Sequence, residues 1–376
     1  MNRRESKTCN RIYFFGNNLM FEKLKKAMRS GIIAGFMAFL ALGLGIFLAG
    51  LVVIGVECYF RHQVVQRQEK QQSGDSWNPN PFFRVPEYGY VFRPDFISKN
   101  MKSIAGETVF KVISLTDDCG RRITPVENRL FRTKFLAFFG GSFTYGHGVS
   151  DNETLAAQVA KWAPAYMPYN YGLPGYGPSQ MLLQLLRHDL RDEIQEQEGI
   201  AIYTFIDEHV KRVIGTMLTV TNWAKGFPCF EERDGTLTYL GSFEQAHPYR
   251  SLFYRLASHE YILRNYNIDI PFHLERHDID LTAAIIEESA KRFAEIYPKS
   301  RFYVLLYPRM SHMFGTQIMG RLQAHHIPCL DYRQLFENIP PEEVQFPDFH
   351  PTPESYARVA RILVSDLNLG AQCPGY

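Results

Sequence analysis

The chain has 376 residues, and its 41 Lys and Arg almost balance its 39 Asp and Glu, giving a formal net charge of +2. This balance excludes a nucleic-acid-binding protein that works through a strongly basic surface. Hydrophobic residues make up 45% of the chain and charged residues 21%, which is typical of a globular protein and not of a disordered or fibrous one.

An apolar segment lies near the N-terminus. Residues 31–56 contain no charged or amide side chain, and about 20 apolar residues in a helix suffice to cross a bilayer. A buried core helix would carry a polar stripe, and the apolar part of a cleaved signal peptide usually has only about 7–15 residues. The segment therefore predicts an uncleaved transmembrane helix.

The flanking charges predict the orientation of this helix. Eight Lys and Arg residues lie in the basic tail formed by residues 1–30, and three lie between residues 57 and 72. Because Lys and Arg concentrate on the cytoplasmic side, we expect a single-pass protein of the cytoplasmic membrane. Its N-terminus is expected inside, and the rest of the chain in the periplasm or outside the cell.

Three further regions follow the apolar segment. Residues 57–80 are polar and rich in Gln, which predicts a linker. Residues 81–130 contain short alternating runs broken by Pro and Gly, and we expect a small β-rich lead-in there. The main domain is expected over residues 131–370, with an irregular, aromatic insertion at about 207–278.

Apolar runs and amphipathic runs alternate through the main domain. The strands that we expect are residues 134–140, 167–172, 200–206, 301–308 and 327–332. Helices are expected from near Glu153, and over 178–197, 280–297, 314–326 and 353–367. Five strands separated by helices predict a doubly wound, parallel α/β sheet, in which functional residues follow the carboxyl ends of the strands.

A serine follows the first of these strands. Gly140 and Gly141 precede Ser142, so its hydroxyl can be presented among free backbone N–H groups. An ordinary turn has the same composition. The segment is not the nucleophile elbow of α/β-hydrolases, since that motif needs Gly where Thr144 stands.

A histidine and an aspartate precede the last helix. Thr352 can cap this helix with Pro353 at its first position, which would hold His350 on the entry loop. Asp348, two residues earlier, can orient the imidazole and favour the imidazolium that forms when His350 accepts a proton from serine. An ordinary helix-entry loop is the alternative interpretation.

The loop after the second strand contains Asn170 and Gly172. Glycine lets the backbone approach a ligand closely, so the Gly172 N–H is a candidate donor to an oxyanion. A simple turn from strand to helix also favours glycine.

Together these segments resemble the SGNH, or GDSL-type, hydrolase superfamily, in particular its membrane-anchored bacterial members. Gly140-Gly141-Ser142 stands in place of its G-D-S block, Gly172 matches its second-block glycine, and Asp348 with His350 matches its last block, although the spacing there is often one residue longer. Over residues 134–368, the resemblance implies a flavodoxin-like three-layer α/β/α fold with a five-stranded parallel sheet. It also implies a Ser142–His350–Asp348 triad and ester chemistry.

One departure concerns the third block, which supplies an Asn side chain to the oxyanion hole of the family. Ile206 stands at that position, and the loss of one such donor costs about 10²–10³ in turnover. Asp207, His209 and Arg212 follow the same strand and are candidate pocket residues, although a salt-bridged strand exit explains them equally well. We expect His209 or Asn170 to supply the missing donor.

These observations predict a membrane-tethered serine esterase or deacylase outside the cytoplasm, acting on O-acyl groups of a glycan or lipid. The Ser142 N–H and Gly172 N–H groups are expected to bind the oxyanion. Two alternatives stay open: an O-acetyltransferase of an extracellular polysaccharide, and a catalytically inactive envelope scaffold. We expect no cofactor, no metal and no nucleic-acid partner, and the sequence leaves protein partners undetermined.

Overall fold

The computed structural model describes residues 22–56 except 24, 27, 32 and 53, and residues 74–370 except 188, 189, 261, 262, 264, 265 and 267. The chain divides into two compact units, Met1–Gln66 and Arg67–Tyr376. The predictions for residues 1–21 and for most of the linker lie outside the described residues.

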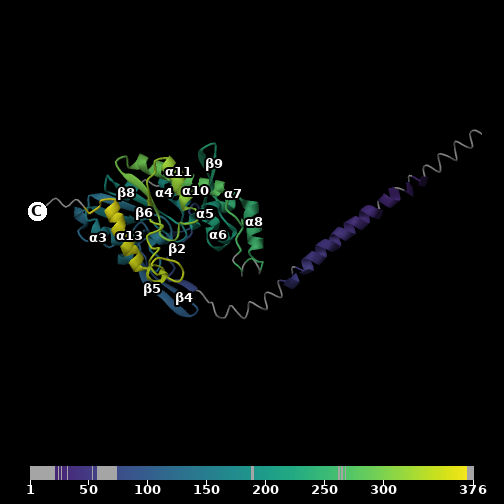
Figure 1. Cartoon of the computed structure of the whole chain (residues 1–376), viewed down its shortest axis with the longest axis horizontal. Helices are drawn as coiled ribbons and strands as arrows, with labels where there is room; N and C mark the ends of the chain where they lie inside the picture. The colour runs from purple at the N-terminus through teal and green to yellow at the C-terminus, as the bar shows by residue number, and fades with distance from the viewer. Residues whose placement is uncertain are drawn as a thin grey trace, which may run out of the picture. The chain divides into compact units, whose positions relative to one another are not determined.

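The N-terminal unit contains one long apolar helix, drawn in purple in Figure 1. The helix Met28–Val56 has 29 residues and a mean hydropathy of 2.7, so it is long and apolar enough to cross a membrane. Its apolar side chains are exposed; Phe39, for example, is 72% exposed. A membrane anchor and a signal sequence both have these properties.

The second unit is built around a five-stranded parallel sheet. Its strands are β6 (Lys134–Phe139), β7 (Tyr166–Asn170), β8 (Gly199–Phe205), β11 (Arg301–Leu306) and β12 (Cys329–Asp331). They lie in the order β12-β11-β8-β6-β7, all parallel, so the chain starts in the middle and winds outward in both directions. This is the flavodoxin-like strand order. The predicted α/β fold class is confirmed.

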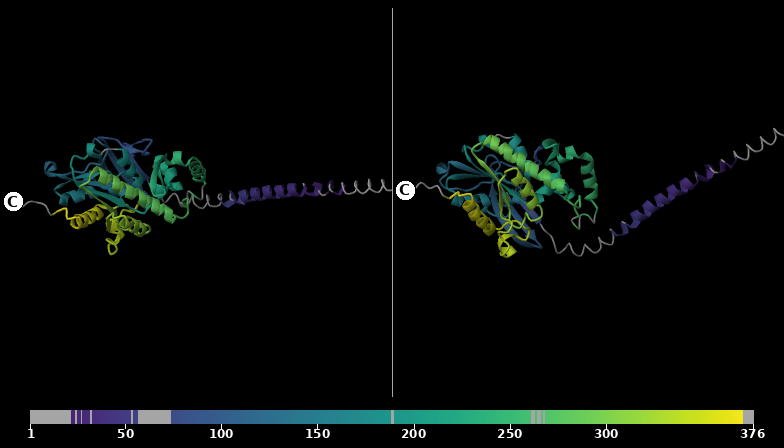
Figure 2. Two further views of the ribbon diagram at one scale, coloured as in Figure 1. Left: turned by 90° about the horizontal axis from the view of Figure 1, so that it is seen from above. Right: turned by 45° about the horizontal axis from the view of Figure 1, so that its top comes forward.

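Helices cover both faces of this sheet, giving three layers (Figures 1 and 2). One face packs against α3 (Leu155–Trp162) and α13 (Pro353–Asp366). The other face packs against α4 (Pro178–Arg187), α10 (Arg276–Ile296) and α11 (Gly315–Ala324).

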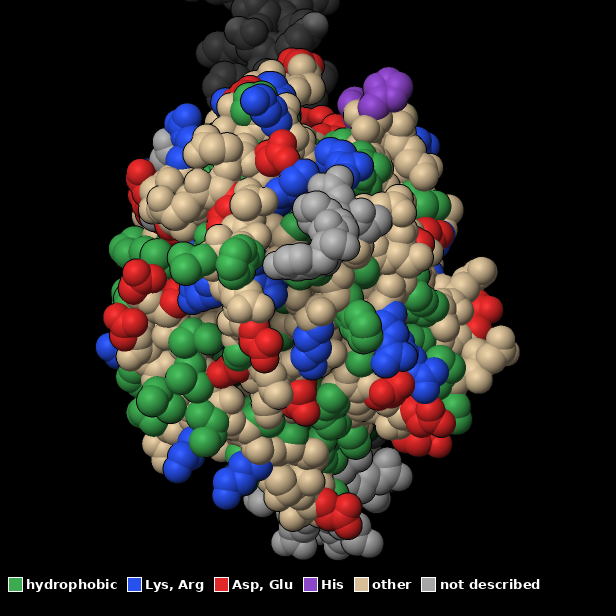
Figure 3. All heavy atoms as spheres, turned by 90° about the vertical axis from the view of Figure 1, so that its left-hand side faces the viewer, with side chains coloured by type: hydrophobic (Ala, Val, Ile, Leu, Met, Phe, Trp, Pro, Cys, Tyr) green, Lys and Arg blue, Asp and Glu red, His purple; other side chains and the backbone are tan. Residues whose placement is uncertain are grey.

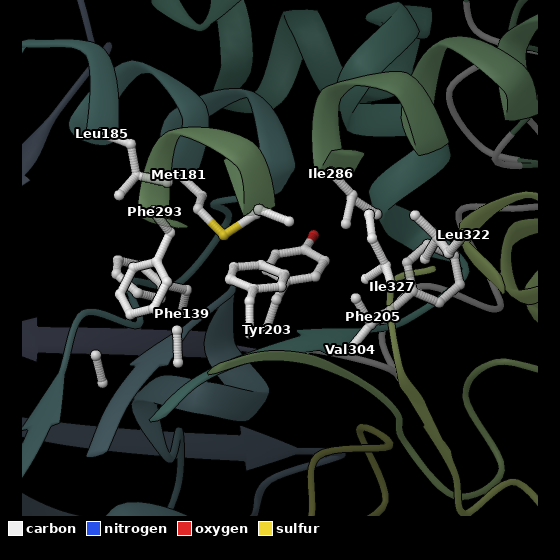
Figure 4. Close-up of a cluster of buried hydrophobic side chains, with 14 of the residues drawn as sticks. Phe139, Met181, Leu185, Tyr203, Phe205, Ile286, Phe293, Val304, Leu322 and Ile327 are labelled. Carbon is white, nitrogen blue, oxygen red and sulfur yellow. The ribbon is translucent and has the colours of Figure 1, made fainter. Parts of the chain in front are cut away.

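Successive residues of each strand point to opposite layers, as a strand with two buried faces requires. In β6, Leu136 and Phe138 join the α3/α13 core, whereas Phe135 and Phe139 join the α4/α10 core. Figure 4 shows Phe139 and Tyr203 of neighbouring strands beneath side chains of α4 and α10.

The region before the main domain contains two small antiparallel sheets. The strands β1 (Gly74–Asn78), β4 (Ile97–Ile104) and β5 (Glu107–Leu115) form one, and β2 (Phe82–Phe83) pairs with β3 (Val91–Phe92) in the other. Residues 74–78 pair with β4, so the predicted linker extends too far at residue 80. The polar composition of this segment does not predict a strand, because the segment becomes a strand by pairing with β4.

Arg122 joins this region to the loop that follows β6. Its guanidinium donates to the carbonyl oxygens of Tyr145 (3.1 Å) and Val149 (2.6 Å), and its Nε donates to Asp151 Oδ1 (2.9 Å). The Arg122 side chain is 1% exposed. The loop after the first central strand is therefore held from outside the main domain.

The insertion is regular, contrary to the sequence prediction. Its elements are α5 (Glu208–Ile214), α6 (Met217–Asn222), η4 (Ala224–Gly226), β9 (Pro228–Arg233), β10 (Thr236–Ser242), α7 (Phe243–Ala246) and α8 (Pro248–Ala257). These elements are too short for a clear hydrophobic period. The predicted helix 178–197 is too long, because residues Leu190–Asp192 form a 3₁₀ helix and the described part of the α-helix is Pro178–Arg187.

The remaining short elements are α2 (Ser142–Tyr145), α12 (Pro341–Val344), η1 (Arg129–Phe131), η2 (Asp151–Glu153) and η3 (Leu190–Asp192). Acidic and basic side chains are interspersed on the face of the molecule in Figure 3. This distribution agrees with a formal net charge of only +2.

Candidate active site

Ser142 lies directly beyond the carboxyl end of the central strand β6. Gly140 has φ 146°, a conformation that favours glycine, and Ser142 begins the short helix α2. The residue is 6% exposed. Its backbone N–H, one of the N-terminal donors that a helix leaves unused, has no acceptor in the described part of the chain.

The loop before α13 brings a histidine and an aspartate to this serine. His350 Nε2 lies 2.9 Å from Ser142 Oγ, and His350 Nδ1 lies 3.0 Å from Asp348 Oδ2. Thr352 caps α13 by accepting from the N–H of Ser355 at 3.2 Å, as the sequence predicts. The loop therefore enters a fixed helix, which limits the movement of the imidazole.

The surroundings of this pair favour a neutral imidazole and an ionised carboxylate. Burial lowers the pKa of His350 below its usual value, and the neighbouring His147 and Lys102 add to this lowering, although Asp348 opposes it. Burial raises the pKa of Asp348, but the hydrogen bond and charge of His350 outweigh burial, and the net pKa is lowered. A neutral histidine can accept a proton from serine.

Two charged residues of the small sheet formed by β1, β4 and β5 complete these surroundings. Lys102 Nζ of β4 lies 3.9 Å from Asp348 Oδ2. Asp75 Oδ2 of β1 lies 3.1 Å from His147 Nε2, and the His147 ring centroid lies 4.5 Å from that of His350. The small sheet of β1, β4 and β5 is therefore part of the site.

Three of these side chains, His147, Asp348 and His350, offer metal-ligating atoms within 4.8 Å of one another. Asp348 and His350 already bind each other, and His350 also contacts Ser142. A cation bound by this set would compete for the lone pairs that link serine to histidine. A second group, Asp117, Asp118 and Cys119, lies on a turn near the surface.

His209 lies at the start of α5, close to Gly141 in the serine loop, as we call residues 140–146. Its Nδ1 is 2.6 Å from Tyr203 Oη, and its Nε2 is buried without a partner among the described residues. Burial lowers the pKa of His209 well below its usual value and raises that of Tyr203 well above its own. Both groups are therefore neutral.

The proton positions follow from this neutrality. The Tyr203 hydroxyl finds no other acceptor in the described structure, so it donates to His209 Nδ1, and the imidazole carries its proton on Nε2. A Cβ placed on Gly141 would stand 3.3 Å from this Nε2. His209 thus directs an unused N–H toward the residue before Ser142.

Arg212, one turn later in α5, approaches the same residue. Its Nη1 donates to Tyr176 O at 2.6 Å, and a Cβ on Gly141 would stand 2.6 Å from that Nη1 and 2.8 Å from Tyr176 O. No carboxylate in the described chain forms an ion pair with Arg212. The guanidinium and the Tyr176 carbonyl therefore occupy the space that a side chain at position 141 would need.

Two sequence assignments near β7 are corrected by the hydrogen bonds. The Gly172 N–H donates to Asn170 Oδ1 at 3.0 Å, so it is not available to an oxyanion. Asn170 Nδ2 donates to Thr144 O at 3.1 Å, so this amide holds the serine loop and is not a free donor. An Asx turn competes with the predicted role, because an Asn side chain readily accepts from the N–H two residues on.

Two further sequence assignments concern the end of β8. Ile206 is 2% exposed and packs in the α3/α13 core. The Asp207 carboxylate accepts from the N–H groups of Met313 (2.9 Å) and Phe314 (3.0 Å) before α11, so it holds that loop, and its place in the pocket stays a prediction. Of the three candidates after this strand, His209 and Arg212 approach the serine loop.

The sequence reasoning missed Gly175, Lys102, Asp75 and His147. Gly175 lies in the loop whose next residue, Tyr176, contacts the position of Gly141, and its own N–H has no acceptor in the described chain. Three glycines between residues 172 and 177 made the choice ambiguous. Lys102 and Asp75 have no sequence signal, since they reach the site only through the pairing of β1 with β4.

No protein-family profile matches the chain, and no curated protein matches it. Solved structures do. One is a lipolytic protein of the G-D-S-L family from Veillonella parvula, with 12% identity and a TM-score of 0.37, covering 62% of this chain and 98% of that one.

Two other solved structures show the same level of likeness. A lipase/acylhydrolase from Enterococcus faecalis has 13% identity and a TM-score of 0.37, covering 65% of this chain and 99% of its own. Axe2, an acetylxylan esterase from Geobacillus stearothermophilus, has 9% identity and a TM-score of 0.36, covering 66% and 98%. The chain is thus similar to GDSL-type structures, but at these values the likeness carries no argument about the reaction.

Proposed function

We propose that this protein is a serine esterase of the SGNH type that removes O-acyl groups from a glycan or a lipid. The observation that carries the proposal is the continuous hydrogen-bonded chain from Ser142 Oγ through His350 to Asp348, with steps of 2.9 and 3.0 Å. Serine nucleophiles are activated by this arrangement on unrelated folds.

The chemistry follows from the three side chains. His350 takes the hydroxyl proton as Ser142 Oγ attacks the ester carbonyl, and Asp348 stabilises the imidazolium that forms. The imidazolium then protonates the leaving alcohol oxygen, which leaves the acyl group on Ser142. Water attacks this acyl-enzyme in the second half of the reaction, again with His350 as base.

The negative charge that develops on the carbonyl oxygen needs donors. We assign the N–H groups of Ser142 and Gly175 and the Nε2–H of His209 to this role. The positive charge of Arg212 lies beside them. His209 takes the role that an Asn side chain has in the family, and Ile206 then needs no polar function. Preorganised donors of this kind are each worth about 10²–10³ in turnover.

The experiment measures hydrolysis of a small acetyl ester, p-nitrophenyl acetate, by the full chain in detergent. Ser142→Ala is expected to lower kcat by about 10⁴-fold or more, as removal of a triad nucleophile does. Ser365→Ala, which changes an exposed serine on α13, is the matched control and should keep full activity. Equal turnover by Ser142→Ala and the unchanged protein would refute the proposal.

We also propose that Met28–Val56 anchors the enzyme in the cytoplasmic membrane, with the N-terminus inside and the esterase unit outside. The charge difference across the apolar segment supports this orientation. A reporter that is active only outside the cytoplasm should be active when fused after Tyr376. An inactive C-terminal fusion, together with activity of a cytoplasmic reporter at the same site, would contradict the orientation.

A further inference from the structure

Two neighbouring hollows lie where the lead-in meets the insertion. Their volumes are about 780 and 420 Å³, and they share Arg84, Trp223, Lys225 and Glu244. Because they have these residues in common, we treat them as one depression and call it the groove. Neither hollow is lined by Ser142 or His350, so the groove is distinct from the site described above.

Aromatic side chains form part of the groove. Trp223 is 42% exposed and Phe83 is 38% exposed, and both line it. A large ring left open to solvent inside a depression, with polar side chains beside it, is typical of a ligand site. The flat face of such a ring suits the apolar C–H face of a sugar ring.

Positive charge surrounds Trp223. Arg84 and Arg255 have no carboxylate partner in the described part of the chain, and Lys225 is paired with Glu244 at 3.0 Å. These two guanidinium groups thus have no counter-charge among the described residues. Arginine binds carboxylate groups through two parallel hydrogen bonds, and it therefore favours an anionic ligand.

One loop separates the groove from the serine. Tyr90 lines the groove and donates from its hydroxyl to Pro174 O at 2.7 Å. A Cβ on Gly175 would collide with that hydroxyl and stand 3.2 Å from Trp223. The next carbonyl, of Tyr176, contacts the position of Gly141 beside Ser142. A chain held in the groove therefore lies next to the loop that borders the nucleophile.

We propose that the groove binds a stretch of an anionic polysaccharide, one whose sugar residues carry carboxylate groups, and so presents neighbouring O-acylated residues to Ser142. Trp223 stacks on a sugar ring, and Arg84 and Arg255 bind carboxylates on either side of it. This inference rests on the proposed esterase function and specifies its substrate class. A site extending over two hollows fits a polymer better than an isolated small ester.

The test measures binding of an oligogalacturonate of about ten residues to the full chain in detergent micelles, by titration calorimetry. A neutral cello-oligosaccharide of the same length is the comparison. Only the anionic chain is expected to bind, and its affinity should fall by at least about tenfold between 50 and 500 mM salt, because charge pairs in an open groove are screened.

Matched variants assign the binding to the groove. Trp223→Ala and the double variant Arg84→Gln/Arg255→Gln should each weaken binding at least about tenfold. Trp162→Ala, which alters another exposed tryptophan (53% exposed) on α3, should bind like the unchanged protein. All three should unfold cooperatively on heating, like the unchanged protein, when followed by circular dichroism, which shows that they fold.

Several results would overturn the proposal. One is that the neutral cello-oligosaccharide binds as tightly as the oligogalacturonate. Another is that both groove variants bind the oligogalacturonate as the unchanged protein does. A third is that the protein binds vesicles of an anionic phospholipid but not the oligogalacturonate. Failure of the esterase function has a different signature, since it is read from Ser142→Ala on the small ester alone. Ser142→Ala should still bind the oligogalacturonate.

Discussion

At the scale of single residues, the candidate site contains a histidine, His209, whose tautomer is fixed by the hydroxyl of Tyr203. The 2.6 Å contact between Tyr203 Oη and His209 Nδ1 leaves Nε2–H as the only donor of the neutral ring. Gly141 and Arg212 also depend on each other, because the Arg212 guanidinium fills the space that a side chain on Gly141 would need.

The first prediction concerns His209 as a donor to the transition state. His209→Phe should lower kcat on p-nitrophenyl acetate by about 10²–10³-fold with little change in KM, since the donor acts only on the developing charge. Tyr203→Phe removes one hydroxyl and keeps the packing. It should lower kcat by a smaller factor, because the tautomer is no longer fixed. Full activity in both variants would exclude His209 from this role.

A second prediction concerns the dependence of activity on pH. His350 must be neutral to accept the serine proton, and its pKa is lowered by burial, His147 and Lys102. Activity should therefore be kept as the pH falls below about 6.5, the usual histidine value, and be lost only at a lower pH. In Lys102→Met a positive charge that disfavours the imidazolium is removed, so the acid limb of kcat/KM should move to higher pH.

The control for this pH profile is Lys99→Met, which changes another lysine of β4, away from Asp348. Its acid limb should coincide with that of the unchanged protein. An identical limb in Lys102→Met would show that this lysine does not act on the imidazole.

At the scale of elements, the lead-in acts as a support for the serine loop. Arg122 inserts its guanidinium among the carbonyl oxygens of Tyr145 and Val149, and it pairs with Asp151 at 2.9 Å. The sheet of β1, β4 and β5 also supplies Lys102 and Asp75. The small sheet and the nucleophile are therefore expected to depend on each other.

The third prediction follows from this arrangement. Arg122→Met should lower the free energy of unfolding by about 3–5 kcal/mol, because it leaves the partly buried Asp151 and the carbonyls of Tyr145, Gly146 and Val149 without this donor. Thermal unfolding followed by circular dichroism measures this change. Arg129→Met alters an exposed arginine of η1 and should change the melting temperature little. Equal melting temperatures for both variants would contradict the supporting role.

At the scale of the whole molecule, the sequence predicts the central architecture well. Runs such as residues 134–140 and 200–206 are almost continuously apolar, which is the pattern of strands buried on both faces, as in a covered parallel sheet. The observed ends of β6 and β8 differ from the ends of these predicted ranges by at most one residue. The start of α13 is also predicted from neighbouring residues alone, because Thr352 caps the helix and Pro353 is its first residue.

What the sequence could not predict depends on contacts between distant segments. The backbone donor was assigned to Gly172, but the Asn170 side chain already accepts its N–H, and only the folded loop reveals that. The sequence makes Asp207 a candidate pocket residue, but it does not reveal that the carboxylate binds N–H groups about a hundred positions later. Lys102 reaches Asp348 across 246 positions of sequence, which no local pattern records.

The central claim is that Ser142 is an activated nucleophile, and reaction with a fluorophosphonate probe tests it most directly. The probe forms a covalent bond with a serine whose hydroxyl is deprotonated by a neighbouring base, so no knowledge of the natural substrate is needed. Mass spectrometry of the labelled full chain should locate one adduct on Ser142. Labelling should vanish in Ser142→Ala and fall strongly in His350→Ala. A folded protein that takes up no probe, or that is labelled equally after Ser142→Ala, would contradict the claim.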